Sequence, residues 1–253
     1  RSARSVVEEV ALCVEMGFRE IMFYDDTFTV SRKRVMEICD LLIERRAPVK
    51  WDVRTRADRL DEPLIERMAQ AGCTKVRIGV EAGTPEILRV LRKEINLDQC
   101  RRAFRKAAEC GMTTFAYFMI GNPTETREQI EQTVAFAKSL RADFVQFGAT
   151  LPLPGTEIYE MGLSQGVIAN DFWREFAANP RADLQIMLWE EKLARDEILD
   201  LLSWAYKSFY SRPSYLFRRL TRIRSVSELY RQARAGLKLL LSRRDSWDQR
   251  QAP

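Results

Sequence analysis

The feature that most limits how this chain can fold is a strand–helix unit repeated about every 30 residues, the length of a βα unit. In the clearest copy, Val76, Ile78 and Val80 alternate with more polar neighbours, which is the two-residue period of a strand with one apolar face. Glu81 stands at the carboxyl end of this strand, and functional groups collect at that end in parallel α/β folds. We therefore expect functional residues at the strand ends.

Local signals predict where the strands stop and the helices start. After the strand that ends at Glu81, Gly83 is expected to let the backbone turn sharply, and Thr84-Pro85 is typical of a helix N-cap and first helical position. Helix-ending glycines precede three of the predicted strands, at Gly17, Gly72 and Gly111. The other expected strands span residues 20–24, 49–55, 113–120 and 143–149, and the expected helices span residues 3–16, 31–46, 61–72, 85–94, 97–111 and 126–140.

This order predicts an α/β fold, namely a partial (β/α) barrel of the TIM type. Right-handed crossovers place every helix on one outer layer when parallel strands follow one another in sequence. A flat doubly wound sheet is the alternative. The strand at 20–24 would be an exposed parallel edge, so we expect a first strand upstream of Arg1. We assign residues 1–160 to the barrel and residues 161–253 to a helical C-terminal extension.

The inner face of the predicted sheet is polar, whereas a closed barrel is filled with Val, Ile and Leu. Its expected residues are Asp52, Arg54, Arg56, Arg77, Glu81 and Gln146. We therefore expect an open barrel with room for a ligand. The alternative is that these charges only pair with one another across the sheet.

Composition removes several kinds of chemistry. The 253 residues include no histidine, the usual general base and zinc ligand, and five dispersed cysteines that suggest neither a disulfide framework nor a metal knuckle. No apolar run approaches the roughly 18 residues of a membrane span, and no signal peptide is apparent. We expect a soluble, cytoplasmic protein with no nucleic-acid partner.

Four segments, in this order, resemble motifs of the radical S-adenosylmethionine (SAM) superfamily: Tyr24–Thr29, Gly79–Pro85, Phe118–Thr126 and Pro152–Tyr159. The resemblance is closest to the subgroup with an N-terminal cobalamin-binding domain, which includes anaerobic porphyrin cyclase-like and methyltransferase-like members. Tyr210–Pro213 resembles a motif of that subgroup's C-terminal extension. Each motif is weak alone, but together they cover residues 1–160.

The resemblance implies an enzyme that uses SAM and a [4Fe–4S] cluster to generate a 5′-deoxyadenosyl radical for hydrogen abstraction, or for methylation or cyclisation of a bulky or lipid-like substrate. The family holds its cluster on a Cys-x3-Cys-x2-Cys loop after the first strand, and that spacing is absent here. We expect that loop upstream of Arg1, and the segment alone to be inactive. Implied partners are an upstream cobalamin-binding domain and an electron donor such as flavodoxin or ferredoxin.

The resemblance also assigns roles to individual residues. Asp25 and Asp26 match the second-strand motif that approaches the methionine part of SAM, although one of them could simply cap a turn. Glu81 matches the position that contacts the polar groups of SAM, where a carboxylate accepts hydrogen bonds from hydroxyl or ammonium groups.

Two further contacts with SAM are implied. Ile120 and Gly121 match the segment that packs on the adenine, and a tight turn into Pro123 is the alternative role for the glycine. Arg54 or Arg56 could pair with the SAM carboxylate, and the sequence does not choose between them. No catalytic residue and no protein-held metal site are predicted.

Two other functions remain open at this point. A metal-assisted barrel lyase could hold Mg²⁺ with Asp25, Asp26 and Glu81. A non-catalytic module could bind a membrane surface or a partner through the tail, because residues 211–253 contain eleven Lys/Arg and three Asp/Glu, a net charge of +8. Residues 211–241 have the spacing of a basic amphipathic helix, which could instead pack on the barrel.

Overall fold

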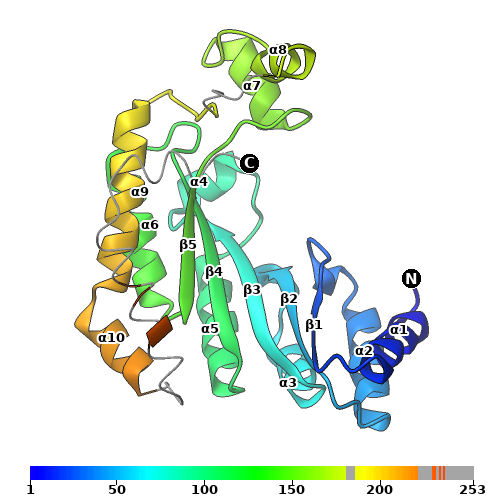
Figure 1. Ribbon diagram of the computed structural model, residues 1–253. Coiled ribbons are helices and arrows are strands. Elements are labelled where there is room, and N and C mark those ends of the chain that lie inside the picture. The colour runs from blue at the N-terminus through cyan, green and yellow to red at the C-terminus, as the bar shows by residue number, and fades with distance from the viewer. Residues whose placement is uncertain (181–185, 222–229, 232–233, 235, 237–253) are drawn as a thin grey trace. The chain divides into compact units, whose positions relative to one another are not determined.

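The computed structural model describes residues 1–180, 186–221, 230, 231, 234 and 236. Its centre is a parallel five-stranded sheet with the strands in sequence order, and this sheet is not closed into a barrel (Figure 1). The strands are β1 (Glu20–Phe23), β2 (Lys50–Arg56), β3 (Cys73–Glu81), β4 (Thr113–Ile120) and β5 (Phe144–Ala149). The predicted strand order and the open α/β fold are therefore confirmed.

Each predicted helix up to residue 140 is present, with ends shifted by a few residues. The helices of this part are α1 (Ala3–Glu15), α2 (Arg32–Glu44), α3 (Glu62–Gln70), α4 (Pro85–Val90), α5 (Leu97–Glu109) and α6 (Arg127–Ser139), with short 3-10 turns η1 (Phe28–Val30) and η2 (Ala57–Arg59). The expected glycines end α1, α3 and α5: Gly17, Gly72 and Gly111 have φ of 96°, 95° and 75°.

The C-terminal part is helical, as expected for the extension. Its helices are α7 (Glu157–Gln165), α8 (Phe172–Ala178), α9 (Arg195–Tyr210) and α10 (Pro213–Leu220). Most of the amphipathic helix predicted for residues 211–241 lies outside the described residues, and α10 is the part of it that the structure describes in full. The division at residue 160 stays a prediction. None of the described helices is both long and apolar enough to cross a bilayer.

The chain forms two compact units. The first consists of residues 1–80, 94–117 and 137–146, and the second of residues 81–93, 118–136 and 147–253. Strands β3, β4 and β5 contribute residues to both units.

The first unit is a layer of helices packed on the buried face of its strands. Helix α1 contacts α2, α2 contacts α3, and α3 contacts α5, so the helices follow the order of the strands. Trp51 is fully buried, and its indole N–H donates to the Ala71 carbonyl at 2.8 Å. A side chain on Gly72 would collide with the backbone at Val49, since a Cβ there would lie 2.6 Å from the carbonyl oxygen.

The second unit is held together by aromatic contacts around β4, β5 and α9. Phe118 stacks on Phe147 with ring centroids 5.6 Å apart, and Phe147 meets Tyr206 of α9 edge to face at 5.5 Å. The Tyr206 hydroxyl also donates to the Phe147 carbonyl at 2.9 Å and accepts from the Phe147 N–H at 3.2 Å. Helix α9 is thus tied to the backbone of β5.

The chain bends after β3 at Gly83 and Thr84, as the sequence predicted, although the φ of Gly83 is not positive. The left-handed backbone conformation in this region belongs to Glu81, which has φ of 69°. Gly83 is needed because α6 lies against it: an added Cβ would be 2.6 Å from the Thr133 Cα and 2.8 Å from the Phe136 Cβ. The Gly83 N–H donates to the Thr133 hydroxyl at 2.9 Å. The glycine therefore permits close packing rather than an unusual backbone conformation.

Candidate functional site

Glu81 is the most unusual of the predicted site residues. It ends β3 in the left-handed region of backbone space, at a φ of 69°. A residue other than glycine in this region costs of the order of 1–3 kcal/mol, and such residues cluster at active sites and ligand clamps. The sequence placed Glu81 at a strand end, but nothing in the sequence indicated this strain.

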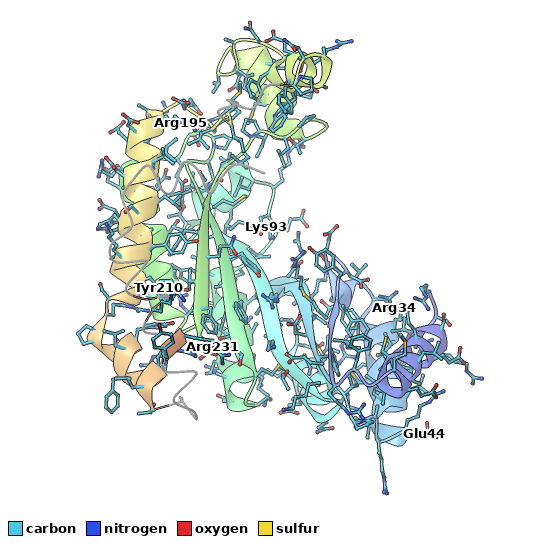
Figure 2. The ribbon with its side chains drawn as sticks, viewed as in Figure 1. Arg34, Glu44, Lys93, Arg195, Tyr210 and Arg231 are labelled. Carbon is cyan, nitrogen blue, oxygen red and sulfur yellow. The ribbon has the colours of Figure 1, made fainter. Side chains whose placement is uncertain are left out.

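Lys93 holds the Glu81 carboxylate. Its Nζ lies 2.7 Å from Glu81 Oε1, and the two side chains are 14% and 20% exposed. Lys93 is labelled in Figure 2, after the short helix α4, where its backbone N–H donates to the Leu88 carbonyl at 2.8 Å. Sequence reasoning missed Lys93, because no spacing rule links a strand end to a residue twelve positions further along.

The predicted adenine segment ends β4. Ile120 is fully buried, and Gly121 adopts φ of 68°, which explains why a glycine stands there. A Cβ on Gly121 would lie 3.2 Å from Ile198 Cδ1 of α9. The structure thus shows Gly121 at a left-handed turn that is closely approached by Ile198, while its role toward an adenine stays a prediction.

A buried polar network follows directly and was not predicted. The Glu125 carboxylate Oε2 accepts from the Asn122 backbone N–H at 3.0 Å and from the Asn122 side-chain amide at 2.9 Å. The Thr150 hydroxyl, after β5, lies 2.7 Å from Asn122 Oδ1 and 3.2 Å from the Ile120 carbonyl oxygen. These contacts join the ends of β4 and β5 around the turn at Gly121.

Among the described residues, no positively charged side chain pairs with Glu125 to offset its burial. The residue is 1% exposed, and its other carboxylate oxygen, Oε1, is buried without a hydrogen-bond partner within the described part of the chain. Burial raises the pKa of Glu125 to about 7, against the lowering effect of its hydrogen bonds from Asn122 and Gly121. The carboxyl group therefore changes its charge near neutral pH.

The remaining candidates lie in the first unit, and they differ in how they are engaged. Arg54 is partly buried, with its guanidinium carbon 4.5 Å from the centre of the Tyr24 ring. Across the described residues it makes no hydrogen bond or ion pair. Arg56 is instead held by Asp58 in a two-point contact of 2.9 and 3.2 Å. Of the two arginines, Arg54 is the one with a guanidinium group open to an anion.

The two acidic candidates after β1 are at the surface. Asp25 lies 3.7 Å from Arg34, with side chains 47% and 29% exposed, and Asp26 is exposed as well. Asp25, Asp26, Arg54 and Arg56 belong to the first unit, whereas Glu81, Ile120 and Gly121 belong to the second.

The alternative of charges that pair across the sheet applies to one set of residues. Arg77 Nη2 donates to Asp52 Oδ2 at 3.0 Å on the neighbouring strand, and Arg77 Nη1 lies 3.4 Å from the Tyr117 hydroxyl. The guanidinium also sits over the Phe115 ring at 4.5 Å. Asp52 and Arg77 thus form a structural pair, while Gln146 is exposed.

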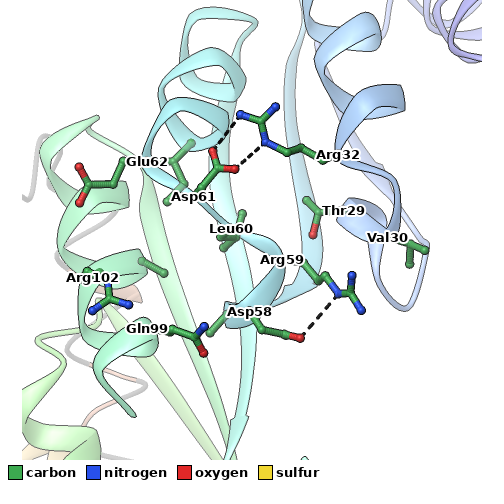
Figure 3. A pocket seen from close by; sticks show the side chains of 13 residues that line it. Thr29, Val30, Arg32, Asp58, Arg59, Leu60, Asp61, Glu62, Gln99 and Arg102 are labelled. Atoms are coloured by element: carbon green, nitrogen blue, oxygen red, sulfur yellow. Dashed lines mark hydrogen bonds and ion pairs between the residues drawn. The ribbon is translucent and has the colours of Figure 1, made fainter. Parts of the chain in front are cut away.

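The cavities of the first unit lie beside the strand ends. One of about 460 Å³ is bounded by η2 and the starts of α2, α3 and α5, and two pairs of its charged side chains contact one another (Figure 3). Arg32 Nε lies 2.6 Å from Asp61 Oδ2, and Arg59 Nε lies 3.6 Å from Asp58 Oδ2. A second, of about 630 Å³, runs along β1 and is lined by Tyr24, Asp25 and Arg34 together with apolar residues of α1 and β1.

The residues present do not fit an iron–sulfur cluster. Three of the five cysteines, Cys39, Cys73 and Cys100, are buried, and burial raises the pKa of Cys39 to about 12 and that of Cys73 further still. In the described ranges no three Cys, Asp or Glu side chains gather as a metal site would require. Cys39, Cys73 and Cys100 are core thiols, as the sequence predicted, whereas Cys13 and Cys110 are partly exposed.

The open parallel α/β sheet has the architecture of partial barrels, a class of folds in which functional sites lie at the carboxyl ends of the strands. Residues 1–137 match the sequence profile of the radical SAM superfamily. The chain belongs to the radical SAM superfamily.

Individual relatives are consistent with this family. An uncharacterised methyltransferase of Pyrococcus horikoshii is 32% identical over 86% of this chain and 46% of its own length. The anaerobic magnesium-protoporphyrin IX monomethyl ester cyclase of Rubrivivax gelatinosus is 28% identical over 85% of this chain and 38% of its own length. The chain therefore spans less than half the length of these relatives.

A solved structure shares the fold. The radical SAM methyltransferase TsrM from Kitasatospora setae, bound to tryptophan and a SAM analogue, matches with a TM-score of 0.56 and 23% identity over 59% of this chain and 30% of that chain. Another structure of TsrM contains cobalamin and a [4Fe–4S] cluster. At this level of identity the likeness establishes the fold.

Proposed function

We propose that this chain is the SAM-binding core of a radical SAM enzyme that methylates or cyclises a bulky substrate. The observation that carries the proposal is the strained, lysine-held Glu81 at the carboxyl end of β3. Relatives that include a methyltransferase and a cyclase favour the same chemistry. We propose SAM as the cofactor because the chain belongs to the radical SAM superfamily.

In this proposal the side chains of the chain bind and orient SAM. Glu81 accepts hydrogen bonds from the hydroxyl or ammonium groups of SAM, and Lys93 fixes the rotamer of that carboxylate. Gly121 has a positive φ and no side chain, so an adenine ring can approach the backbone after β4 closely. Within the first unit, Arg54 is the arginine open to a carboxylate, because Asp58 already engages Arg56.

The bound SAM would supply the radical for hydrogen abstraction or the methyl group, and the protein would supply position and electrostatics. Because the cysteines of this chain are dispersed and three of them are core thiols, we propose that the cluster ligands come from sequence outside these 253 residues. We also propose a cobalamin-binding domain and an electron donor such as flavodoxin or ferredoxin as partners, because the resemblance to the cobalamin-binding subgroup implies both.

Equilibrium SAM binding to the Glu81→Gln variant tests the proposal. Loss of a charged hydrogen-bond acceptor costs about 1.5–3 kcal/mol, so the dissociation constant should rise roughly 10- to 100-fold. Glu86→Gln is the matched control, since Glu86 is an exposed acid of α4, only five positions away, and should leave binding unchanged. Equal affinities of wild type and Glu81→Gln would remove Glu81 from the site.

A second substitution separates binding from folding. Glu81→Gly removes the carboxylate and relieves the left-handed backbone by about 1 kcal/mol, which offsets part of the cost of leaving Lys93 without its counter-charge, so the fold should be kept while SAM binding is lost. A variant that does not fold would show that the carboxylate contributes mainly to stability. The metal-assisted lyase gains no support, because Glu81 already has Lys93 as its counter-charge and no three acidic or cysteine side chains of the described residues gather as a metal site would require.

A further inference from the structure

Helix α10 carries a large apolar face that no described part of the chain covers. Leu216, Phe217 and Leu220 are 49%, 72% and 59% exposed. At 3.6 residues per turn the three side chains fall within about 100° of the helix circumference, so they form one stripe, here called the α10 stripe. On the other side of the helix, Tyr215 is 6% exposed and packs against Phe209 of α9 at 5.4 Å.

Arginines flank the stripe, and aromatic rings support them. The Arg218 guanidinium lies over the Tyr215 ring at 5.7 Å, and that of Arg212 lies over Phe209 at 4.3 Å. Arg212 Nε also donates to the Phe209 carbonyl at 2.9 Å, and both arginines are partly buried. Arg231 is exposed and is labelled near the α10 end of the second unit in Figure 2.

In the sequence, the charged residues on either side of α10 are predominantly basic. Residues 201–227 contain six Lys/Arg and no Asp/Glu. Residues 211–253 carry a net charge of +8, from eleven Lys/Arg and three Asp/Glu, so the rest of the chain carries −3 of the total of +5. Exposed apolar side chains among cations and without acids are the pattern of a helix that lies at a lipid interface.

We propose that the α10 stripe and its arginines dock the chain on an anionic lipid bilayer. The apolar side chains enter the boundary between headgroups and acyl chains, and the guanidinium groups pair with lipid phosphates. A bilayer fits better than a protein partner, because three side chains cover far less than the roughly 800 Å² per partner that a stable protein interface buries. A bilayer needs no such matching surface.

Flotation of the 253-residue chain with vesicles tests the proposal. The chain should float with vesicles of equal parts phosphatidylcholine and phosphatidylglycerol at low salt, and it should not float with pure phosphatidylcholine. It should be released in high salt, because the Debye length falls from about 10 Å at 0.1 M to about 3 Å at 1 M.

Two triple variants distinguish the effect of losing the α10 stripe from the effect of added negative charge. L216E/F217E/L220E should lower the vesicle-bound fraction at least about tenfold, since it removes the inserted apolar area. L12E/M16E/V30E is the matched control, because it adds the same charge at side chains that are 59%, 76% and 68% exposed in the first unit, and it should keep most of the binding. Thermal melts establish that each variant is folded, and Phe217→Ser gives a milder change at the same place.

Several outcomes would overturn the proposal. The first is that the wild-type chain stays in the soluble fraction at low salt. The second is that the control variant loses as much vesicle binding as the α10 variant. The third is that vesicle binding does not depend on the lipid charge. If light scattering shows that the wild-type chain is a dimer, and only L216E/F217E/L220E disrupts this dimer, the α10 stripe binds a second copy of the chain instead. SAM affinity should be the same in both triple variants, so this result is independent of the proposed SAM site.

Discussion

Two carboxylate–cation pairs, one in each unit, are built in different ways. Asp52 and Arg77 face each other from neighbouring strands of the first unit, 3.0 Å apart, and the sheet itself places them there. Glu81 and Lys93 of the second unit are 2.7 Å apart, but the pair requires a strained residue at the end of β3 and a loop that returns after α4. One pair follows from strand geometry and the other does not.

The difference separates structural charges from candidate binding groups. Arg77 is already occupied by Asp52, the Tyr117 hydroxyl and the Phe115 ring, so its role in the fold accounts for it. The conformation of Glu81 costs free energy that ordinary folding would avoid, and such strain motivates a functional hypothesis. The same contrast divides Arg56, which Asp58 holds, from Arg54, which rests on the Tyr24 ring.

The largest predicted effect concerns Gly83, which lets α6 approach the loop of the strained pair. Gly83→Ala should lower the free energy of unfolding by roughly 3 kcal/mol, because the new Cβ would meet Thr133 Cα at 2.6 Å and that atom is backbone. Gly148→Ala is the control, since no atom lies within 4 Å of its added Cβ, and it should change stability by less than about 0.5 kcal/mol. Denaturant melts measure both. Similar values for the two variants would show that the loop is not fixed by this contact.

The next effect concerns the pH dependence that Glu125 gives to the second unit. Its pKa is raised from 4.5 to about 7 in the folded protein, so between these values the native state binds more protons than the unfolded state. The stabilising contribution is complete below pH 4.5 and is lost as the pH rises through 7. At about 1.4 kcal/mol per pKa unit, the loss is at most roughly 3 kcal/mol.

Denaturant melts from pH 5 to pH 8 check this expectation. The free energy of unfolding of the wild type should fall across that range, and Glu125→Gln, which is uncharged throughout, should show a flatter profile. The exposed Glu86→Gln provides a reference for general charge effects. Parallel profiles for wild type and Glu125→Gln would contradict the prediction.

Much of the fold was predictable from the sequence, because period and end signals act locally. Alternation placed Val76, Ile78 and Val80 on a buried strand face, and helix-ending glycines such as Gly72 marked the starts of strands. The sequential strand order followed from the handedness of crossovers and not from any single residue.

The site was only partly predictable, because its decisive features are not local. Glu81 was proposed from its place at a strand end and Gly121 from the family resemblance, whereas the Lys93 contact depends on how the chain returns after α4. The network of Asn122, Glu125 and Thr150 joins residues 28 positions apart in sequence, so no periodicity reveals it. Backbone strain at Glu81 has no sequence signature at all, since glutamate is uncommon at positive φ.

The smallest predicted effect tests the contrast between the two arginines of β2. If Arg54 pairs with the SAM carboxylate, Arg54→Gln should weaken SAM binding roughly tenfold, or about 1.4 kcal/mol, while the fold is kept because the side chain leaves no partner behind among the described residues. Arg56→Gln should leave SAM binding within about twofold, since its guanidinium is committed to Asp58 at 2.9 Å, a contact whose loss acts on the η2 turn. Calorimetric titration of SAM into each variant measures both effects. Arg54→Lys adds a further distinction, because a lysine keeps the charge but loses the fork of two parallel N–H groups, so an intermediate affinity indicates two-point recognition of a carboxylate. A larger loss of SAM affinity in Arg56→Gln than in Arg54→Gln would mean that SAM displaces Asp58 from Arg56. In that case an arginine that already has an acidic partner could no longer be assigned a purely structural role.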